Sequence, residues 1–160
     1  MANAVSTAGM LVKYCVEATA GTRPTSGYTI IPGCKALPAL GNDPNMLDAT
    51  PLSAKKNKFY IPGLSDSGGS MGITVNDYKA FRDKWTACRT AYAGLTGGKQ
   101  MWFEFSYPEG SELDSFYFPG EPLELGFSGA EVDSVLENTA NIAPAGDYLF
   151  AAASTATISG

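Results

Sequence analysis

One segment of the chain carries apolar residues at the spacing of an amphipathic helix. Between Asn76 and Gly94 the large apolar side chains lie three, four, three and four residues apart, which keeps them on one stripe of a helix with 3.6 residues per turn. These residues are Tyr78, Phe81, Trp85, Cys88 and Tyr92. Asn76 or Asp77 is suited to cap the start of the helix, and Gly94 is suited to end it. The spacing predicts one helix over about 77–93 that packs on a sheet.

Most of the remaining pattern is typical of short strands and turns. Residues 101–107 alternate, with Met101, Phe103, Phe105 and Tyr107 on one face, and this favours a half-exposed strand. Other candidate strands are 11–19, 58–61, 72–75, 116–118, 123–127, 131–138 and 148–153. One helix cannot form a core alone, so it must cover a sheet system. We predict a single α+β domain over 1–160, dominated by an antiparallel β-sandwich or barrel with one flanking helix.

Residues 22–54 combine many prolines and glycines with large apolar residues. The stretch is too apolar for a disordered linker and too long for a structureless loop inside a compact domain. We therefore predict a projecting arm, within about 22–58, whose apolar side chains are buried on another molecule. The arm residues expected to contact a neighbouring subunit are Leu40, Met46, Leu47, Leu52, Lys55, Lys56 and Lys58. Extra strands packed on the protein's own core remain the alternative for this stretch.

Composition narrows the possible chemistry. Only 17% of the residues are charged, which favours contact between subunits, and the net charge of −5 disfavours nonspecific binding to phosphates. Histidine is absent, so Ser–His–Asp and Cys–His catalysis and imidazole metal ligands are excluded. The three cysteines lack the spacing of a metal site. We expect no catalytic residue, no cofactor, no bound metal and no membrane-spanning segment.

Several passages, taken in order, resemble the major tail tube proteins of long-tailed, non-contractile (siphovirus-type) phages. Asp-Ala-Thr-Pro-Leu at 48–52 and Lys-Phe-Tyr-Ile-Pro-Gly-Leu-Ser-Asp at 58–66 resemble that family's "T-x-L … k-x-y-i-p-G-L-x-D-x-G" passage. The expected helix follows, and then Trp-Phe-Glu-Phe at 102–105 resembles the strand after it. The passages 118–120, 125–128, 130–133 and 137–139 resemble the closing strands. The resemblance runs from about residue 29 to residue 148.

This resemblance implies a virion protein, made in the host bacterial cytoplasm, with a β-sandwich and one helix. Such subunits form six-membered rings, and the rings stack into a hollow tube around a tape-measure protein. The tube also meets a tail tip or initiator complex and a tail terminator, and DNA passes through it without specific binding. The family's loop before the "I-P-G-L-x-D" strand reaches the adjacent ring or subunit, which corresponds to residues 42–58 here. The resemblance transfers no catalytic residue.

A duct for DNA works best when its wall repels phosphates, so acidic side chains are expected to face the lumen. By their strand positions, Glu104, Glu124 and Asp133 are the candidates. Two other functions stay open. One is the tube component of a contractile injection system or bacteriocin. The other is a carbohydrate-binding or hydrolytic β-sandwich, which would need a cleft with aromatic side chains and paired carboxylates.

Overall fold

A large antiparallel sheet and one helix make up the body of the protein in the computed structural model, which describes residues 4–40, 43–66 and 69–157. The strands are β1 (Leu11–Val16), β2 (Ser26–Ile31), β3 (Cys34–Ala36), β4 (Asp43–Asp48), β5 (Tyr60–Asp66), β6 (Met71–Asn76), β7 (Met101–Ser106), β8 (Ser115–Pro122), β9 (Glu137–Pro144), β10 (Leu149–Ala151) and β11 (Thr155–Thr157). The helix is α1 (Lys79–Ala93). Within the described residues no helix is long and apolar enough to cross a membrane.

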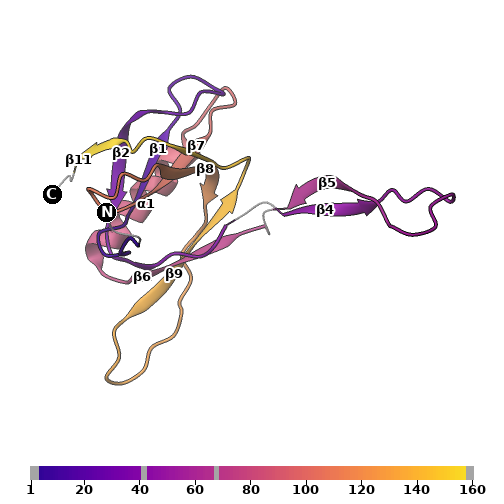
Figure 1. Cartoon of the computed structure of the whole chain (residues 1–160). Helices are drawn as coiled ribbons and strands as arrows, with labels where there is room; N and C mark the ends of the chain where they lie inside the picture. The colour runs from indigo at the N-terminus through magenta and orange to yellow at the C-terminus, as the bar shows by residue number, and fades with distance from the viewer. Residues whose placement is uncertain (1–3, 41–42, 67–68, 158–160) are drawn as a thin grey trace.

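Among the described residues nine strands form the main sheet, in the order β11-β2-β1-β7-β8-β9-β6-β3, with β10 paired to β8 (Figure 1). The pairing of β11 with β2 is parallel, and the other pairings are antiparallel. Strand β8 connects the part of the sheet formed by β11, β2, β1 and β7 to the part formed by β9, β6 and β3. Its first residues pair with β7 and β10, and its last residues, from Gly120 to Pro122, pair with β9. A Cβ atom at Gly120 would lie 2.8 Å from Ile142 Cγ2, so glycine allows the close approach at this junction. The β-dominated α+β fold with one helix is confirmed.

Helix α1 packs its apolar face against the core, as its periodicity predicts. Phe81, Trp85 and Cys88 are buried and pack with Phe103 and Phe118 from the central strands. The helix begins two residues later than predicted, with Tyr78 in an extended conformation as its N-cap and no side-chain cap. The predicted caps Asn76 and Asp77 therefore do not serve that purpose.

Two of the predicted strands are wrong. Residues 123–127 have no strand structure, and residues 131–136 form a turn and coil that precede β9. Neither segment has a strand partner in the described chain, and most of their side chains are exposed. In Figure 1 this segment extends from the body next to β9 as an orange loop.

The predicted arm divides into two parts. Residues 26–36 form β2 and β3 within the main sheet, and Leu40 packs against the core, so this half follows the alternative of extra strands on the protein's own body. Strands β4 and β5 form a separate two-stranded ribbon that projects far from the body (Figure 1). The projecting segment thus covers residues 43–66, further along the chain than 22–58.

Candidate assembly surfaces

The β4–β5 ribbon, called the arm below (residues 43–66), is a hairpin with an ordered tip. Leu47 pairs with Ile61 and Asp48 with Tyr60, and a register irregularity lies between Pro44 and Met46. Proline is tolerated here because both strands of a two-stranded ribbon are edge strands. The proline therefore favours an edge position for this strand rather than a central position in a larger sheet.

Hydrogen bonds close the arm tip, residues 49–59. Ala49 N donates to Phe59 O at 2.8 Å, and Phe59 N donates to Thr50 Oγ1 at 2.9 Å. Thr50 N in turn donates to Asp48 Oδ1 at 2.9 Å, and this bond and one from the Thr50 side chain lower the pKa of the Asp48 carboxyl. The tip is therefore held in a defined shape at the end of the ribbon.

The arm exposes large apolar side chains along its length. Leu52 at the tip is fully exposed, and about half of each of five further large apolar side chains is accessible to solvent. These residues are Met46, Leu47, Phe59, Tyr60 and Ile61. An isolated two-stranded ribbon has little stability in water, and soluble monomers rarely expose extensive apolar patches. The arm has the character of a surface that another molecule covers.

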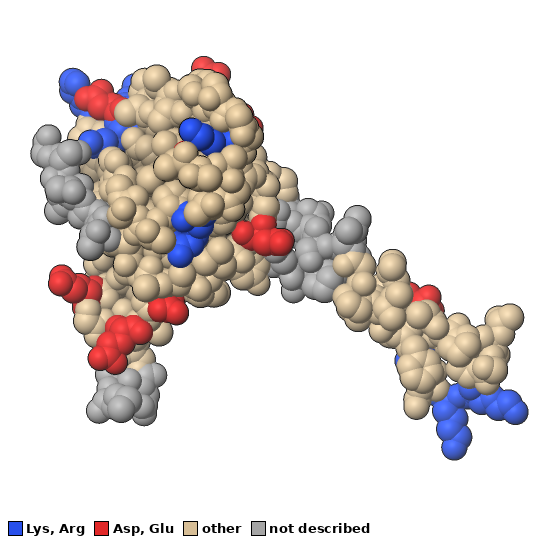
Figure 2. Space-filling model, turned by 90° about the horizontal axis from the view of Figure 1, so that it is seen from above, with Lys and Arg blue, Asp and Glu red and all other residues tan. Residues whose placement is uncertain are grey.

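The arm tip is positively charged. Lys55, Lys56 and Lys58 are exposed, and Figure 2 shows basic side chains gathered at the far end of the projection. The ion pairs of the described residues join Lys13, Lys35, Lys79 and Arg82 to carboxylates, and none of them involves the arm. The tip lysines are therefore available to a partner.

The second exposed surface is the segment between β8 and β9, residues 123–136, called the acidic loop below. Trp85 Nε1 donates to Leu123 O at 2.9 Å and ties the start of the loop to the helix. Asn138 Nδ2 donates to Gly126 O at 2.8 Å, and Asp77 N donates to Leu136 O at 2.9 Å. Both ends of the acidic loop are thus anchored to the body.

Asp77 connects this anchor to helix α1. Arg82 donates to both carboxylate oxygens of Asp77, at 2.5 and 2.7 Å. These hydrogen bonds lower the pKa of the Asp77 carboxyl below its usual value, against the opposing effect of burial. The carboxylate therefore stays ionised and holds helix and loop together near neutral pH.

The acidic loop exposes both carboxylates and apolar side chains. Glu124, Glu131 and Asp133 are exposed, and Asp133 lies at a turn with a positive φ of 60°. Phe127, Val132, Val135 and Leu136 are the exposed large apolar residues of the loop. A hollow of about 740 Å³ lies beside the loop, with residues of 128–139 in its wall. Two of the three predicted acidic residues, Glu124 and Asp133, are thus accessible on this loop.

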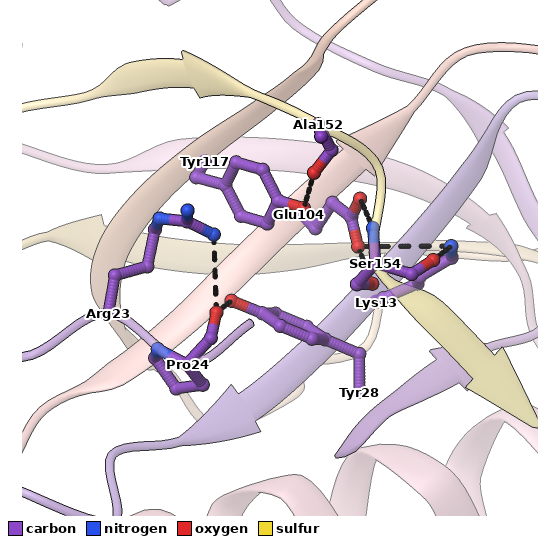
Figure 3. Close-up of polar contacts among 8 residues, drawn as sticks. All are labelled: Lys13, Arg23, Pro24, Tyr28, Glu104, Tyr117, Ala152 and Ser154. Carbon is purple, nitrogen blue, oxygen red and sulfur yellow. Dashed lines mark hydrogen bonds and ion pairs between the residues drawn. The ribbon is translucent and has the colours of Figure 1, made fainter. Parts of the chain in front are cut away.

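Glu104 is a different case, and its assignment to a lumen is wrong for this subunit, because its side chain is fully buried. Lys13 Nζ lies 3.8 Å from Glu104 Oε1, and Ser154 donates to Glu104 through both its backbone nitrogen and its hydroxyl (Figure 3). Burial, together with the nearby Glu104 carboxylate, raises the pKa of Tyr117 to about 12. A carboxylate in this position is enclosed within the subunit and cannot face passing DNA.

The face of β7 that carries Glu104 is buried because the C-terminal segment covers it. Tyr117 Oη donates to Ala152 O at 2.6 Å, and the same face holds the Trp102 ring (Figure 3 shows the Tyr117 contact). Trp102 Nε1 donates to Glu17 at 2.8 Å. Burial raises the pKa of Glu17, but hydrogen bonds from Trp102 and from two backbone nitrogens outweigh it and lower that pKa. The sequence analysis did not identify the buried contacts of Glu17 and Ser154. Each of these contacts joins residues that lie far apart in the sequence, so no local pattern indicates it.

The two hollows below, both in the part of the chain that the structure describes, lack the combination of aromatic side chains and paired carboxylates that a carbohydrate-binding or hydrolytic site would need. An aromatic hollow of about 280 Å³ contains Phe105, Tyr107, Phe116, Tyr148 and Phe150 in its wall, but no carboxylate. The larger hollow beside the acidic loop contains Glu131 and Glu137 but no aromatic residue. Over the same described residues, no group of His, Cys, Asp and Glu is arranged to hold a metal ion.

Comparison with solved structures finds chains of large assemblies that have a similar fold. No family model and no curated protein matches the sequence. A chain in the six-fold symmetrised baseplate of the anti-feeding prophage has a TM-score of 0.63 and 11% identity, covering 95% of this chain and 98% of that one. A chain in the tail of the empty gene transfer agent particle, with C6 symmetry, has a TM-score of 0.57 and 17% identity, covering 89% and 96%. A chain in the sheath/tube terminator of an extracellular contractile injection system has a TM-score of 0.61 and 13% identity, covering 94% and 99%.

These likenesses show that the chain has a fold used in phage-like tails and injection systems. They extend over nearly the whole chain, so the fold as a whole is shared. The three matched chains come from structures described as a baseplate, a tail and a sheath/tube terminator.

Proposed function

We propose that this chain is a tube subunit of a phage-type tail and assembles with copies of itself into stacked six-membered rings. The observation that carries the proposal is the shared fold, over 89% of the chain, with a tail described with C6 symmetry. Contacts that close by rotation produce rings, and repeated contacts along an axis produce a filament. Strands β11 and β3 lie at the two edges of the main sheet, where pairing with neighbouring subunits would cover them.

The arm supports contact between subunits or adjacent rings. Its apolar residues Met46, Leu47 and Leu52 are exposed in the single chain, and the ion pairs found among the described residues do not include its lysines. Burial of such side chains on a second copy supplies a driving force of about 25 cal/mol per Å² of apolar surface. Leu40 is left out of this role because it packs against the core.

The tube would conduct DNA during ejection. The net charge of −5 per subunit, repeated around a ring, suits a wall that repels phosphates. Glu124, exposed near the end of β8, is the carboxylate we propose for this wall. Asp133 lies among exposed apolar residues of the acidic loop, such as Val132 and Val135, and this setting suits contact with another subunit better. The other partners of this proposal are a tape-measure protein, a tail tip or initiator complex and a tail terminator, within a virion made in the bacterial cytoplasm.

The sequence resemblance points to a non-contractile, long-tailed phage, whereas one of the structures that share the fold is of an extracellular contractile injection system. A tube component of such a contractile machine is therefore the second candidate function. The two candidates differ in whether a sheath surrounds the tube. Affinity purification of the tagged chain from its native particle distinguishes them, because only the contractile machine yields a sheath protein at a matching stoichiometry.

The proposal is tested by assembly of the purified chain. We expect hollow tubes in negative-stain electron micrographs, either at high protein concentration or after seeding with the tail tip complex. The double substitution Leu47→Asp with Leu52→Asp is expected to abolish tubes while the circular dichroism of the subunit is unchanged. Leu113→Asp, at an exposed leucine outside the arm, is the matched control and should leave assembly intact. Monomers alone under both conditions would contradict the proposed function.

A further inference from the structure

The arm tip and the acidic loop carry opposite charge. The arm tip contains Lys55, Lys56 and Lys58 and no acidic residue over 49–59. The acidic loop carries three carboxylates, among them Glu131 and Asp133, and no basic residue over 123–136. Complementary charge favours encounter between two surfaces and sets their register.

The same two surfaces also match in apolar character. Leu52 and Phe59 are exposed beside the lysines of the arm tip. On the acidic loop, Val132 is 91% exposed and Phe127 is 82% exposed. Each surface therefore combines apolar side chains with a single sign of charge, which is the composition of a buried centre with a polar rim.

The hollow beside the acidic loop provides a place for the arm tip. Its volume of about 740 Å³ is in the range that accommodates several side chains. Val135 and Leu136 contribute apolar surface to its wall, and Glu131 contributes a carboxylate. An apolar side chain entering this hollow would bring the tip lysines close to the loop's carboxylates.

A second negatively charged segment is a less suitable acceptor. Residues 107–114 contain Glu109, Glu112 and Asp114, but only one exposed large apolar residue, Leu113. Its charge matches the arm tip, whereas its apolar surface does not. The acidic loop matches in both respects.

The arm and the acidic loop leave the body in different directions (Figure 1), so their contact joins different subunits. A contact between two different surfaces of identical subunits is heterologous, and each subunit then has one donor and one acceptor. Such a contact propagates from subunit to subunit, as a ring or a stack of rings requires.

We propose that the arm tip of one subunit docks in the hollow beside the acidic loop of a second copy, with Lys55 and Lys56 facing Glu131 and Asp133. This inference rests on the proposed function, since it assumes that the chain assembles with copies of itself. It adds the acceptor surface for the arm, and it places Asp133 between subunits.

Charge reversal tests the pairing directly. The arm variant K55E/K56E and the loop variant E131K/D133K each place like charges together, so each alone is expected to reduce the yield of sedimentable tubes at least tenfold. An equimolar mixture of the two variants is expected to restore the yield. In the mixture every reversed arm can meet a reversed loop, and every original arm an original loop. The quadruple variant should also assemble.

A matched control separates specific pairing from net charge. Combining K55E/K56E with E109K/E112K yields the same net charge as the quadruple variant and the wild type, but reverses the other negatively charged segment. Each reversed pair includes one residue with a φ of 60°, Asp133 or Glu112, so the backbone demands are similar. We expect this control combination to remain unassembled. Circular dichroism and melting temperature of each variant verify that the subunit is folded.

Three results would overturn the inference. Normal tubes from K55E/K56E alone would show that the tip lysines face no carboxylate, and rescue by E109K/E112K would place the acceptor on residues 107–114. Loss of tubes that neither the mixture nor the quadruple variant restores would place it elsewhere on the subunit. In each case wild-type tubes still form, so the proposed function stands. Failure of the wild type to assemble under any condition contradicts the proposed function itself.

Discussion

The buried ion pair of Lys13 and Glu104 offers a quantitative test of how the C-terminal segment closes the fold. Lys13 Nζ lies 3.8 Å from Glu104 Oε1, and the two side chains are 7% and 0% exposed. Lys13→Met keeps a side chain of similar length but removes the charge, so Glu104 remains buried without its cation. Removing one partner of a buried pair costs about 3–5 kcal/mol, and the attraction of two charges near this distance is about 4 kcal/mol at an effective dielectric constant of about 20. We expect Lys13→Met to lower the free energy of unfolding by about 3–5 kcal/mol.

Urea denaturation of the dilute subunit measures this loss, with fluorescence of the buried Trp85 and Trp102 as the signal. The melting temperature should fall by about 10 °C, since about 1 kcal/mol corresponds to about 2–4 °C at this chain size. Lys79→Met is the matched control. Lys79 pairs with Asp83 at 2.7 Å on the exposed face of the helix, where solvent screens the two charges, so its loss should leave the free energy of unfolding nearly unchanged.

The double substitution Lys13→Met with Glu104→Gln distinguishes a buried charge from a packing defect. It removes both charges and keeps one oxygen that accepts the hydrogen bond of Ser154 N, while the new amide nitrogen can donate to the Ser154 hydroxyl. We expect it to recover at least half of the stability lost in Lys13→Met. The reasoning is refuted if Lys13→Met costs less than about 1 kcal/mol, or if the double variant is no more stable than Lys13→Met.

Two further predictions concern pH and backbone conformation. The pKa values of the Glu17 and Asp77 carboxyls are lowered in the folded state, so their stabilisation is present above the unfolded pKa of about 4 and is lost as pH falls through the folded values. The free energy of unfolding should therefore decline between about pH 5 and pH 2, and less steeply in Glu17→Gln; equal slopes would contradict this. Gly33→Ala should lose more stability than Gly21→Ala in thermal melts. Both glycines have a φ of +83°, but only at Gly33 would a Cβ meet a side chain, 2.7 Å from Tyr78 Cε1, so equal losses would show that the close contact does not matter.

The helix and the central strands could be predicted from the sequence because a local period records which side of an element faces the core. Phe81, Trp85 and Cys88 follow the period of 3.6 and are all buried. Phe103 and Phe105 follow the period of two in β7, and both lie in the core. Residues 123–127 alternate in the same way without forming a strand, since a strand also needs a partner that only the fold provides.

The candidate surfaces were only partly predictable. The apolar and lysine content of the arm is visible in the sequence, but Leu40 and Leu47 occur in the same proline-rich stretch and have different fates. Leu40 packs against the core, whereas Leu47 lies exposed on the ribbon. The local sequence pattern does not indicate which of the two leucines is buried, because their burial depends on where the chain leaves the main sheet.

The sequence by itself determined the class of fold, the single helix and the charge and apolar content of the segment that became the arm. The tertiary structure decided which carboxylates are accessible. Glu104 has the sequence context of a half-exposed strand, yet Ser154, 50 residues further along the chain, covers it, while Asp133 remains at the surface. Burial depends on which distant segment packs over a side chain, and a pattern read over neighbouring residues contains no record of that contact.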